Sequence, residues 1–142
     1  MLVGQLALMT AAAFAGTAFY VSAVEHPARL ALDASSALSQ WKPSYARGAI
    51  MQAGLAAVAG ALGLLALWLT RDWHWLVGAI LILSPWPYTL VGIMPTNRAL
   101  KAVAPERADA DTRAKLETWG RLHAGRTALG VAAVLAYLWA LN

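Results

Sequence analysis

The sequence contains no cysteine and few charged residues. Asp, Glu, Lys and Arg together make up 13% of its 142 residues. The lack of cysteine excludes disulfides, thiolate metal sites and cysteine nucleophiles. The low charge is unusual, because a soluble domain carries about 25% charged residues. With 60% hydrophobic residues and a mean hydropathy of +0.55, residues 1–142 are predicted to form one membrane domain.

Four long apolar segments predict four transmembrane helices, since about 20 apolar residues span the hydrocarbon core. The first ends at Pro27, and it reads as a span rather than a cleaved signal peptide because no basic residue precedes it. In the second, the pairs Ala56 with Gly60 and Ala59 with Gly63 favour close helix packing. The predicted fold is therefore an all-α, four-helix transmembrane bundle, with spans at about 3–24, 46–70, 75–94 and 119–141.

Three further features are expected in this bundle. Residues 28–41 have helical spacing but are too polar to span, so they predict an interfacial helix between the first two spans, ended by Pro43. The prolines in Ser84–Tyr88 predict a bent or broken third span. The fourth helix is expected to extend on the cytoplasmic side of its span, with a cap at Asp109, Asp111 or Thr112.

The basic residues lie almost entirely on one side of the predicted membrane. The loops after the first and third spans, with their flanks, hold nine of them, whereas the opposite side holds only Arg71. The positive-inside rule then predicts a multi-pass protein of the cell (inner) membrane, with both termini outside the cytoplasm. The net charge of +4 is explained by topology, and nucleic-acid binding is not expected. The nine residues are Arg29, Lys42, Arg47, Arg98, Lys101, Arg107, Arg113, Lys115 and Arg121.

A polar stripe marks the start of the fourth span. Trp119, His123 and Arg126 lie within about 60° of one another on a helix. Such groups are costly in lipid and usually face a protein interior or a wet cavity, so they indicate a functional site. The other three spans place polar or aromatic residues at the same depth, where a four-helix bundle would bring them together: Glu25, His26, Trp41, Tyr45, Arg47 and Asn97.

Each of these residues also has a structural interpretation. Glu25 is able to pair with Arg47 or Arg126, and both histidines are able to serve as structural groups. Arg126 is able to reach the headgroups. A metal site is a further alternative, because His26, His123 and Glu25 suit copper, iron or zinc. Against it, the sequence has no His-x-x-x-His or Glu-x-x-His pair, no metal ligand set is predicted, and Arg126 would oppose a cation.

Over nearly its whole length the sequence resembles the anthrone oxygenase-like family of small four-helix membrane proteins. The resemblance is carried by Glu25-His26-Pro27, by Trp41 with Tyr45 and Arg47, by Met94-Pro95-Thr96-Asn97, and by Trp119 with His123 and Arg126. It implies oxygenation of a lipophilic aromatic ketone to a quinone by O₂, without metal or flavin. In that reading His123 is the base, assisted by Glu25 or His26, and Arg126 and Asn97 face the enolate oxygen.

Other functions stay open at this point. One is a metal- or haem-dependent membrane oxidoreductase that uses copper, iron or haem at His26 and His123. Another is a binding or transport protein without catalysis, favoured by the broken third span but not by the lack of inverted halves. A third is a scaffolding subunit. The expected partners are a lipophilic substrate, O₂ and membrane lipid, with a homo-oligomer as a further expectation.

Overall fold

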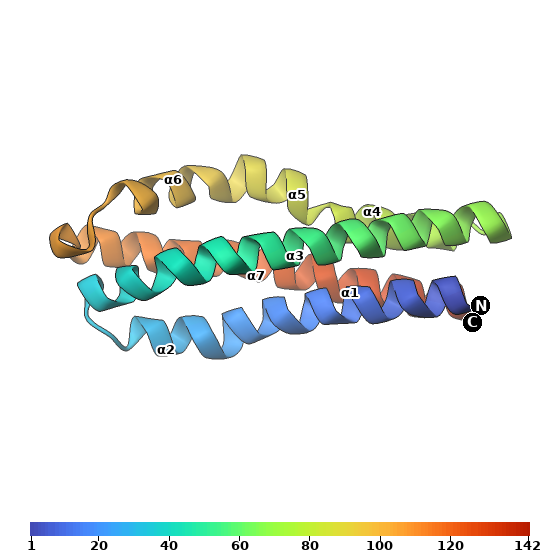
Figure 1. Ribbon diagram of the computed structural model, residues 1–142, viewed down its shortest axis with the longest axis horizontal. Helices are drawn as coiled ribbons and strands as arrows, with labels where there is room; N and C mark the ends of the chain where they lie inside the picture. Colours follow the sequence, from blue (N-terminus) through green and yellow to red (C-terminus); the bar gives the residue numbers. More distant parts are fainter.

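The computed structural model describes all 142 residues and shows four antiparallel helical rods (Figure 1). Both termini lie at one end of the bundle, here called the terminal end, and the two long connections lie at the other, the loop end. The elements are α1 (Leu2–Tyr20), η1 (Val21–Glu25), α2 (His26–Leu30), α3 (Ala34–Thr70), α4 (His74–Leu83), α5 (Pro85–Tyr88), η2 (Thr89–Ile93), α6 (Met94–Ala102), η3 (Pro105–Arg107) and α7 (Ala110–Leu141).

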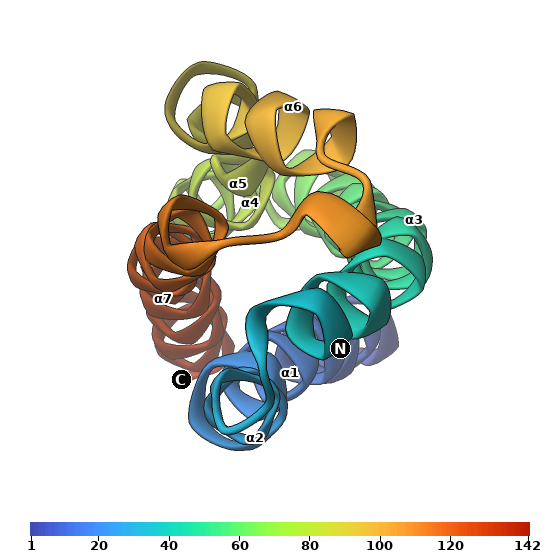
Figure 2. The same ribbon diagram turned by 90° about the vertical axis from the view of Figure 1, so that its left-hand side faces the viewer.

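The four rods are each long and apolar enough to cross a membrane. The bundle viewed along its axis places α1 beside α3 and α7, with α4 closing the ring on the far side (Figure 2). This arrangement confirms the predicted all-α, four-helix membrane bundle. The rods cover residues 2–30, 34–70, 74–102 and 110–141, so each extends beyond the span predicted from hydropathy.

The first and third rods continue through prolines at which the sequence predicted their ends. Proline has no N–H, and its ring crowds the carbonyl four residues earlier. Both rods accommodate this with a π-helical segment that ends two residues before the proline: η1 before Pro27 and η2 before Pro95. π segments widen a helix locally and are frequent at functional sites. The helix ends predicted at Pro27 and at Met94-Pro95 were therefore wrong.

The predicted interfacial helix over residues 28–41 was also wrong. Its first part completes α2, and from Ala34 onward it is the start of α3, a single helix of 37 residues with Pro43 inside it. Asp33 caps α3 by accepting a hydrogen bond from the Ser36 N–H at 3.0 Å. Trp41 is fully buried in the bundle. Burial of this indole against the other rods outweighs the single hydrogen bond that Pro43 removes.

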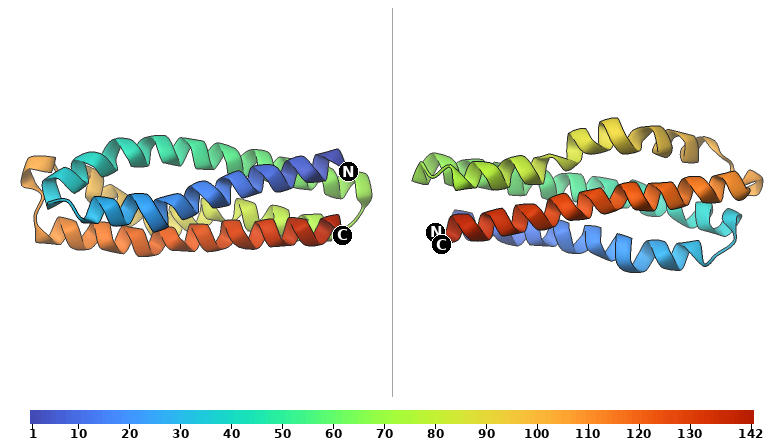
Figure 3. Two further views of the ribbon diagram at one scale, coloured as in Figure 1. Left: turned by 90° about the horizontal axis from the view of Figure 1, so that it is seen from below. Right: turned by 180° about the vertical axis from the view of Figure 1, so that it is seen from behind.

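Two other expectations are confirmed. The third rod breaks at Ser84, between α4 and α5, and α5 and α6 are displaced from the line of α4 (Figure 1). The fourth rod, α7, runs the full length of the bundle (Figure 3). It begins with a capping box in which Asp109 accepts the Thr112 N–H at 2.9 Å and Thr112 accepts the Asp109 N–H.

The bundle has two separate apolar cores. The terminal core is built around alanines with Phe14, Trp75, Ile82 and Tyr137, and the loop core around Leu, Ile and Trp side chains. Ala56, Ala59, Gly60 and Gly63 are all buried, as their small-residue spacing predicted. The candidate site lies between the two cores, since Ile93 and Trp119 of the loop core line it and its Arg126 lies over the Phe14 ring of the terminal core. The loop core comprises Ala37, Leu38, Trp41, Ile93, Leu100, Leu116 and Trp119.

Candidate functional site

A small central cavity lies among η1, α3, η2, α6 and α7, with a volume of about 30 Å³. Its walls combine aromatic, hydroxyl, amide and cationic side chains. All four rods contribute to it, so its shape depends on the packing of the whole bundle. The lining residues are Val21, Ser44, Tyr45, Gly48, Ala49, Gln52, Thr89, Ile93, Asn97, Trp119, His123 and Arg126.

His123 is a buried histidine held on two sides. Its Nδ1 lies 3.2 Å from the hydroxyl of Ser22, a residue of η1, and that hydroxyl lies 3.1 Å from the Thr127 hydroxyl. The imidazole stacks on the Trp119 indole, with ring centroids 4.9 Å apart. The only hydrogen-bond partner of the ring is Ser22 at Nδ1, so Nε2 is left without a protein partner. This is the geometry of a histidine oriented at one nitrogen and available at the other.

Arg126 lies one turn further along α7 and has no carboxylate partner. Its guanidinium donates to the Thr89 hydroxyl at 3.1 Å and to the Gln52 side-chain oxygen at 2.9 Å. Both partners are neutral, and the Arg126 Nε is buried without any hydrogen-bond partner. Arg126 forms no salt bridge. A largely enclosed cation with neutral partners and a free donor is suited to an anionic ligand.

A chain of hydrogen bonds forms the opposite wall. The Trp119 indole N–H donates to the Asn97 side-chain oxygen at 2.9 Å, and the Asn97 amide donates to the Tyr45 hydroxyl at 3.0 Å. Trp41 lies behind this wall, stacked on Tyr45 with centroids 4.8 Å apart and edge-on to Trp119 at 5.9 Å. Asn97 is completely buried. The wall is therefore fixed by side-chain hydrogen bonds and aromatic packing together.

The charged residues at the end of the first rod form a closed network beside the cavity. Glu25 pairs with Arg29 at 2.7 Å and also accepts hydrogen bonds from Ser44 and from Gln40. Arg29 donates to His26 Nδ1 at 2.8 Å, and His26 Nε2 lies 2.9 Å from the Leu116 carbonyl oxygen. Glu25 thus pairs with Arg29, and the pairing with Arg47 or Arg126 weighed from the sequence was wrong. Both nitrogens of His26 are engaged, unlike Nε2 of His123.

Two lateral grooves meet the central cavity through shared walls. The first, here called the lipid groove, has a volume of about 310 Å³. It shares Tyr45, Ala49, Thr89 and Arg126 with the cavity, and continues along Ala53, Pro85, Trp86, Leu90 and Met94. The second, the polar groove, lies between the first rod and α3, has a volume of about 430 Å³ and is lined by Glu25 and Arg47.

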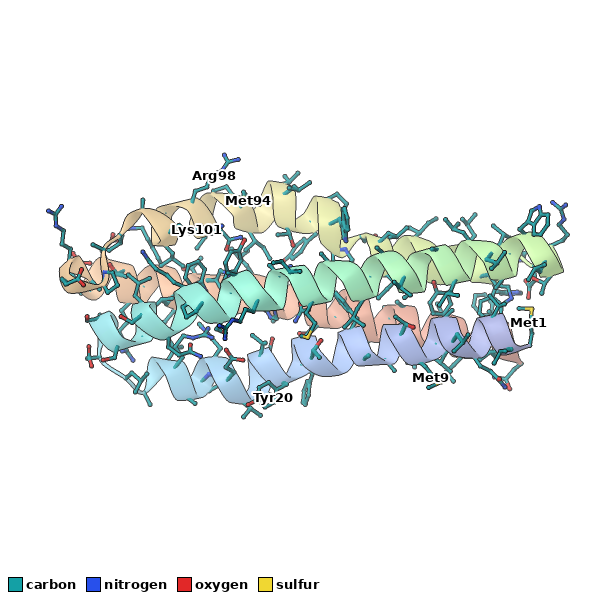
Figure 4. The ribbon with its side chains drawn as sticks, in the orientation of Figure 1. Met1, Met9, Tyr20, Met94, Arg98 and Lys101 are labelled. Carbon is teal, nitrogen blue, oxygen red and sulfur yellow. The ribbon has the colours of Figure 1, made fainter.

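Several side chains lie on the outer faces of the rods. Met9 and Tyr20 on α1, and Arg98 on α6, point away from the bundle (Figure 4). Met9 is 66% exposed and Tyr20 54%. Lys101 instead lies over the Tyr45 ring, 4.6 Å from its centroid. Tyr45 therefore has a cation against its ring and also lines the same cavity as Arg126.

The structure brings five of the nine predicted site residues to one cavity: Tyr45, Asn97, Trp119, His123 and Arg126. Of the other four, Glu25 and Arg47 line the polar groove, and Trp41 and His26 support the wall from behind.

Sequence reasoning missed several residues of the site. The clearest signal was Gln52, because it is the one side-chain amide inside the second apolar segment. The contact of Arg29 with Glu25 was also predictable, because the two residues have the i,i+4 spacing of a helical ion pair. Ser22 and Thr89 carried no such signal, since their contacts depend on the π segments η1 and η2.

The donor set of the site contains no arrangement typical of a metal centre. No group of three or more His, Asp or Glu side chains is placed to share an ion. His26 and His123, which the sequence offered as a ligand pair, both pack against Trp119. His26 Nε2 faces the Leu116 carbonyl oxygen, so only Nδ1 has a lone pair to offer a metal, and Nδ1 accepts a hydrogen bond from Arg29.

A model of the anthrone oxygenase family matches residues 41–136. The chain belongs to the anthrone oxygenase family. The match includes Trp41, Asn97, Trp119, His123 and Arg126, and it confirms the resemblance seen in the sequence. It indicates an oxygenase-related role for this membrane bundle. Searches of curated proteins and of solved structures find no match to the chain.

Proposed function

We propose that this protein is a membrane oxygenase that converts a lipophilic, acidic aromatic ketone of the anthrone type to a quinone with O₂, without a cofactor. The observation that carries the proposal is the pairing of His123, free at Nε2, with Arg126, free of any carboxylate, at one cavity. A base and an anion-binding cation are the two groups that enolate formation requires.

His123 is the proposed base. An anthrone has an acidic CH₂ group opposite its ketone carbonyl, and removal of one proton gives an aromatic enolate. In the proposed mechanism Nδ1 carries the proton and donates it in a hydrogen bond to the Ser22 hydroxyl, 3.2 Å away, which leaves the Nε2 lone pair for the substrate. The stacked Trp119 ring fixes the plane of the imidazole and adds an apolar wall for a planar substrate.

Arg126 is the proposed partner of the enolate oxygen. Its Nε donor is unpaired, and its terminal nitrogens are held by Gln52 and Thr89. A preorganised cation stabilises the developing negative charge without reorganisation at the moment of reaction. Asn97 is held by Trp119 and Tyr45 and forms the polar part of the opposite wall.

The proposed reaction balances with O₂ as the oxidant. The enolate gives one electron to O₂, and the carbon radical and superoxide then combine to form a carbon–oxygen bond. Protonated His123 returns its proton to the peroxide. Loss of the second C–H proton breaks the oxygen–oxygen bond, forms the new carbonyl and releases water. The carbon loses four electrons, and O₂ gains four, one oxygen atom staying in the quinone and one leaving in water.

The test is anthrone-dependent O₂ uptake by the purified protein in lipid nanodiscs, corrected for the spontaneous reaction. We expect His123→Ala to lower the rate about 100-fold or more, which is the usual contribution of a general base. With ¹⁸O₂, the quinone should carry one labelled oxygen. Metal analysis and an absorption spectrum of the same sample test the metal and haem alternatives.

His74 provides a matched control for His123. It is a half-buried histidine that, like His123, packs against tryptophan, with ring centroids 4.2 Å from Trp73 and 4.0 Å from Trp139, and its Nδ1 lies 2.5 Å from an Asp72 carboxylate oxygen. It lies at the terminal end, remote from the cavity, so His74→Gln should retain wild-type uptake. Wild-type turnover by His123→Ala would contradict the proposed base.

The proposal places the loop end in the cytoplasm, supported by the nine-to-one distribution of basic residues. The cysteine-free chain makes this simple to test. A single cysteine at Arg98→Cys, on the exposed face of α6, should resist a membrane-impermeant thiol reagent in intact cells. A cysteine at Arg71→Cys should react, and the reverse pattern would contradict the orientation.

A further inference from the structure

The lipid groove extends the site sideways out of the bundle. Its inner end is the wall that it shares with the central cavity, where Arg126, Tyr45 and Thr89 lie. Its outer part passes between α3 and the displaced third rod, along Trp86, which is 48% exposed, and Leu90, which is 63% exposed. These residues lie within candidate membrane spans, so the groove opens toward the hydrocarbon of the bilayer.

The chemistry of the groove changes along its length. The inner end carries a guanidinium with only neutral partners and an unpaired Nε. The floor on α3 is made by the small side chains of Ala49 and Ala53, and the facing wall by Trp86 and Leu90. A molecule that fits the groove has an anionic oxygen at one end, to face the guanidinium, and a flat or slender apolar body.

We propose that the lipid groove is a binding site for membrane-dissolved amphiphilic anions, with the anionic oxygen on Arg126 and the apolar body in the groove between α3 and Trp86. In the proposed reaction this anion is the enolate that His123 forms from the substrate, and in that respect the proposal rests on the proposed function. It adds that the substrate is bound from the bilayer with its apolar part against lipid. Ala53 then determines which apolar bodies fit.

Two aromatic probes of equal size test the charge requirement. Anthracene-2-carboxylate and anthracene-2-carboxamide differ only in charge, and both accept energy from tryptophan fluorescence. Binding is measured for the full chain in nanodiscs and corrected with protein-free nanodiscs. We expect at least about tenfold tighter binding of the carboxylate, as for one charge-assisted hydrogen-bonded pair. Arg126→Gln should remove this preference, and Arg126→Lys should retain part of it.

Filling the groove tests the location. Ala53→Phe should weaken binding of both probes at least about tenfold, because the ring would occupy the floor of the groove. Ala61→Phe is the matched control, since Ala61 lies on the same helix, is exposed and lines no cavity. It should bind as the wild type does. Equal affinity of the wild type for the two probes, or unchanged binding by Ala53→Phe, would overturn the proposal.

His123→Ala separates this proposal from the proposed function. It leaves Arg126 and the groove in place, so it should bind the carboxylate with wild-type affinity while its O₂ uptake falls. Carboxylate preference together with undiminished O₂ uptake in His123→Ala would support the groove and contradict the base. His123-dependent uptake without carboxylate preference in the wild type would support the base and overturn the groove.

Discussion

The terminal half and the loop half of this bundle are built from different residues. In the terminal half, helices approach closely over alanine and glycine, and Tyr137 fits against Gly63 and Gly78 with its hydroxyl 2.8 Å from the Ala59 carbonyl oxygen. In the loop half the rods lie further apart (Figure 1) and contain tryptophans, prolines and π segments. No residue of the terminal core lines a cavity.

The two halves differ in the interactions that stabilise them. The terminal half is stabilised by close packing in lipid, which small residues permit. The loop half combines a satisfied charge network, Glu25 with Arg29 and His26, and an unsatisfied cation, Arg126. The charge network stabilises the fold, whereas Arg126 keeps a hydrogen-bond donor that a ligand is able to use. The candidate functional site lies where the two halves meet.

The largest expected effect on stability comes from breaking the charge network. Glu25→Ala leaves the Arg29 guanidinium, whose side chain is 1% exposed, without its carboxylate. We expect the free energy of unfolding to fall by about 3 kcal/mol, since an unpaired buried charge remains. Unfolding by SDS titration in mixed micelles, followed by circular dichroism, measures the change.

The exposed pair of Arg113 with Glu117, at 3.7 Å, has the same i,i+4 spacing and is the matched control. Glu117→Ala should lower the free energy of unfolding by less than about 1 kcal/mol, because water screens the pair. Equal losses in the two variants would show that the Glu25 network does not stabilise the loop half.

The second effect belongs to the terminal half. A Cβ at Gly78 would lie 2.3 Å from two atoms of the Tyr137 ring, and that ring is completely buried. Gly78→Val should therefore lower the free energy of unfolding by roughly 1–3 kcal/mol. Gly54, which has nothing within 4 Å of its Cβ position, is the control, and Gly54→Ala should stabilise by up to about 1 kcal/mol. A neutral Gly78→Val would mean that the terminal half is loosely packed.

The terminal half was the more predictable from sequence. Hydropathy predicted the rods, and the spacing of Ala56, Gly60, Ala59 and Gly63 predicted their close faces, because both depend on local patterns. The cap at Asp109 was among the three candidates for the same reason. In contrast, the continuation of α3 through Pro43 depends on tertiary packing of Trp41, which no local rule contains.

The candidate site was predictable in part. Trp119, His123 and Arg126 share a stripe set by helix geometry alone, and Asn97 was placed at the same depth by topology. The sequence did not separate His26 from His123, since only the fold shows that Arg29 and a carbonyl engage both nitrogens of His26. It also missed Ser22 and Thr89, because the rotation that π segments introduce is not visible in residue spacing.

The third prediction concerns Arg126 and tests whether this residue of the loop half serves ligand binding or stability. Arg126→Met replaces an incompletely paired cation, which is costly to bury, by an apolar chain of similar length. We expect the free energy of unfolding to stay within about 1 kcal/mol of wild type or to rise, while O₂ uptake falls at least about 100-fold. Unfolding titrations and O₂ uptake on the same preparation measure both. A destabilisation comparable to that of Glu25→Ala would show that Arg126 is structural.

The smallest effect is a pH dependence at the start of α7, outside the membrane-spanning segments. The backbone N–H of Thr112 and then its side chain hold the pKa of Asp109 below its usual value, which is about 3.9 in an unfolded chain. A lowered folded-state pKa means that the contribution of the cap is complete above pH 4–5, by the usual value, and is lost as the pH falls through the folded pKa. Asp109→Asn should therefore unfold more easily than wild type at pH 7. The gap between the two should narrow as the pH is lowered toward about 3, because the wild-type carboxylate becomes protonated. A gap that stays constant with pH would assign the effect to the shape of the side chain, since asparagine also caps helices, rather than to its charge.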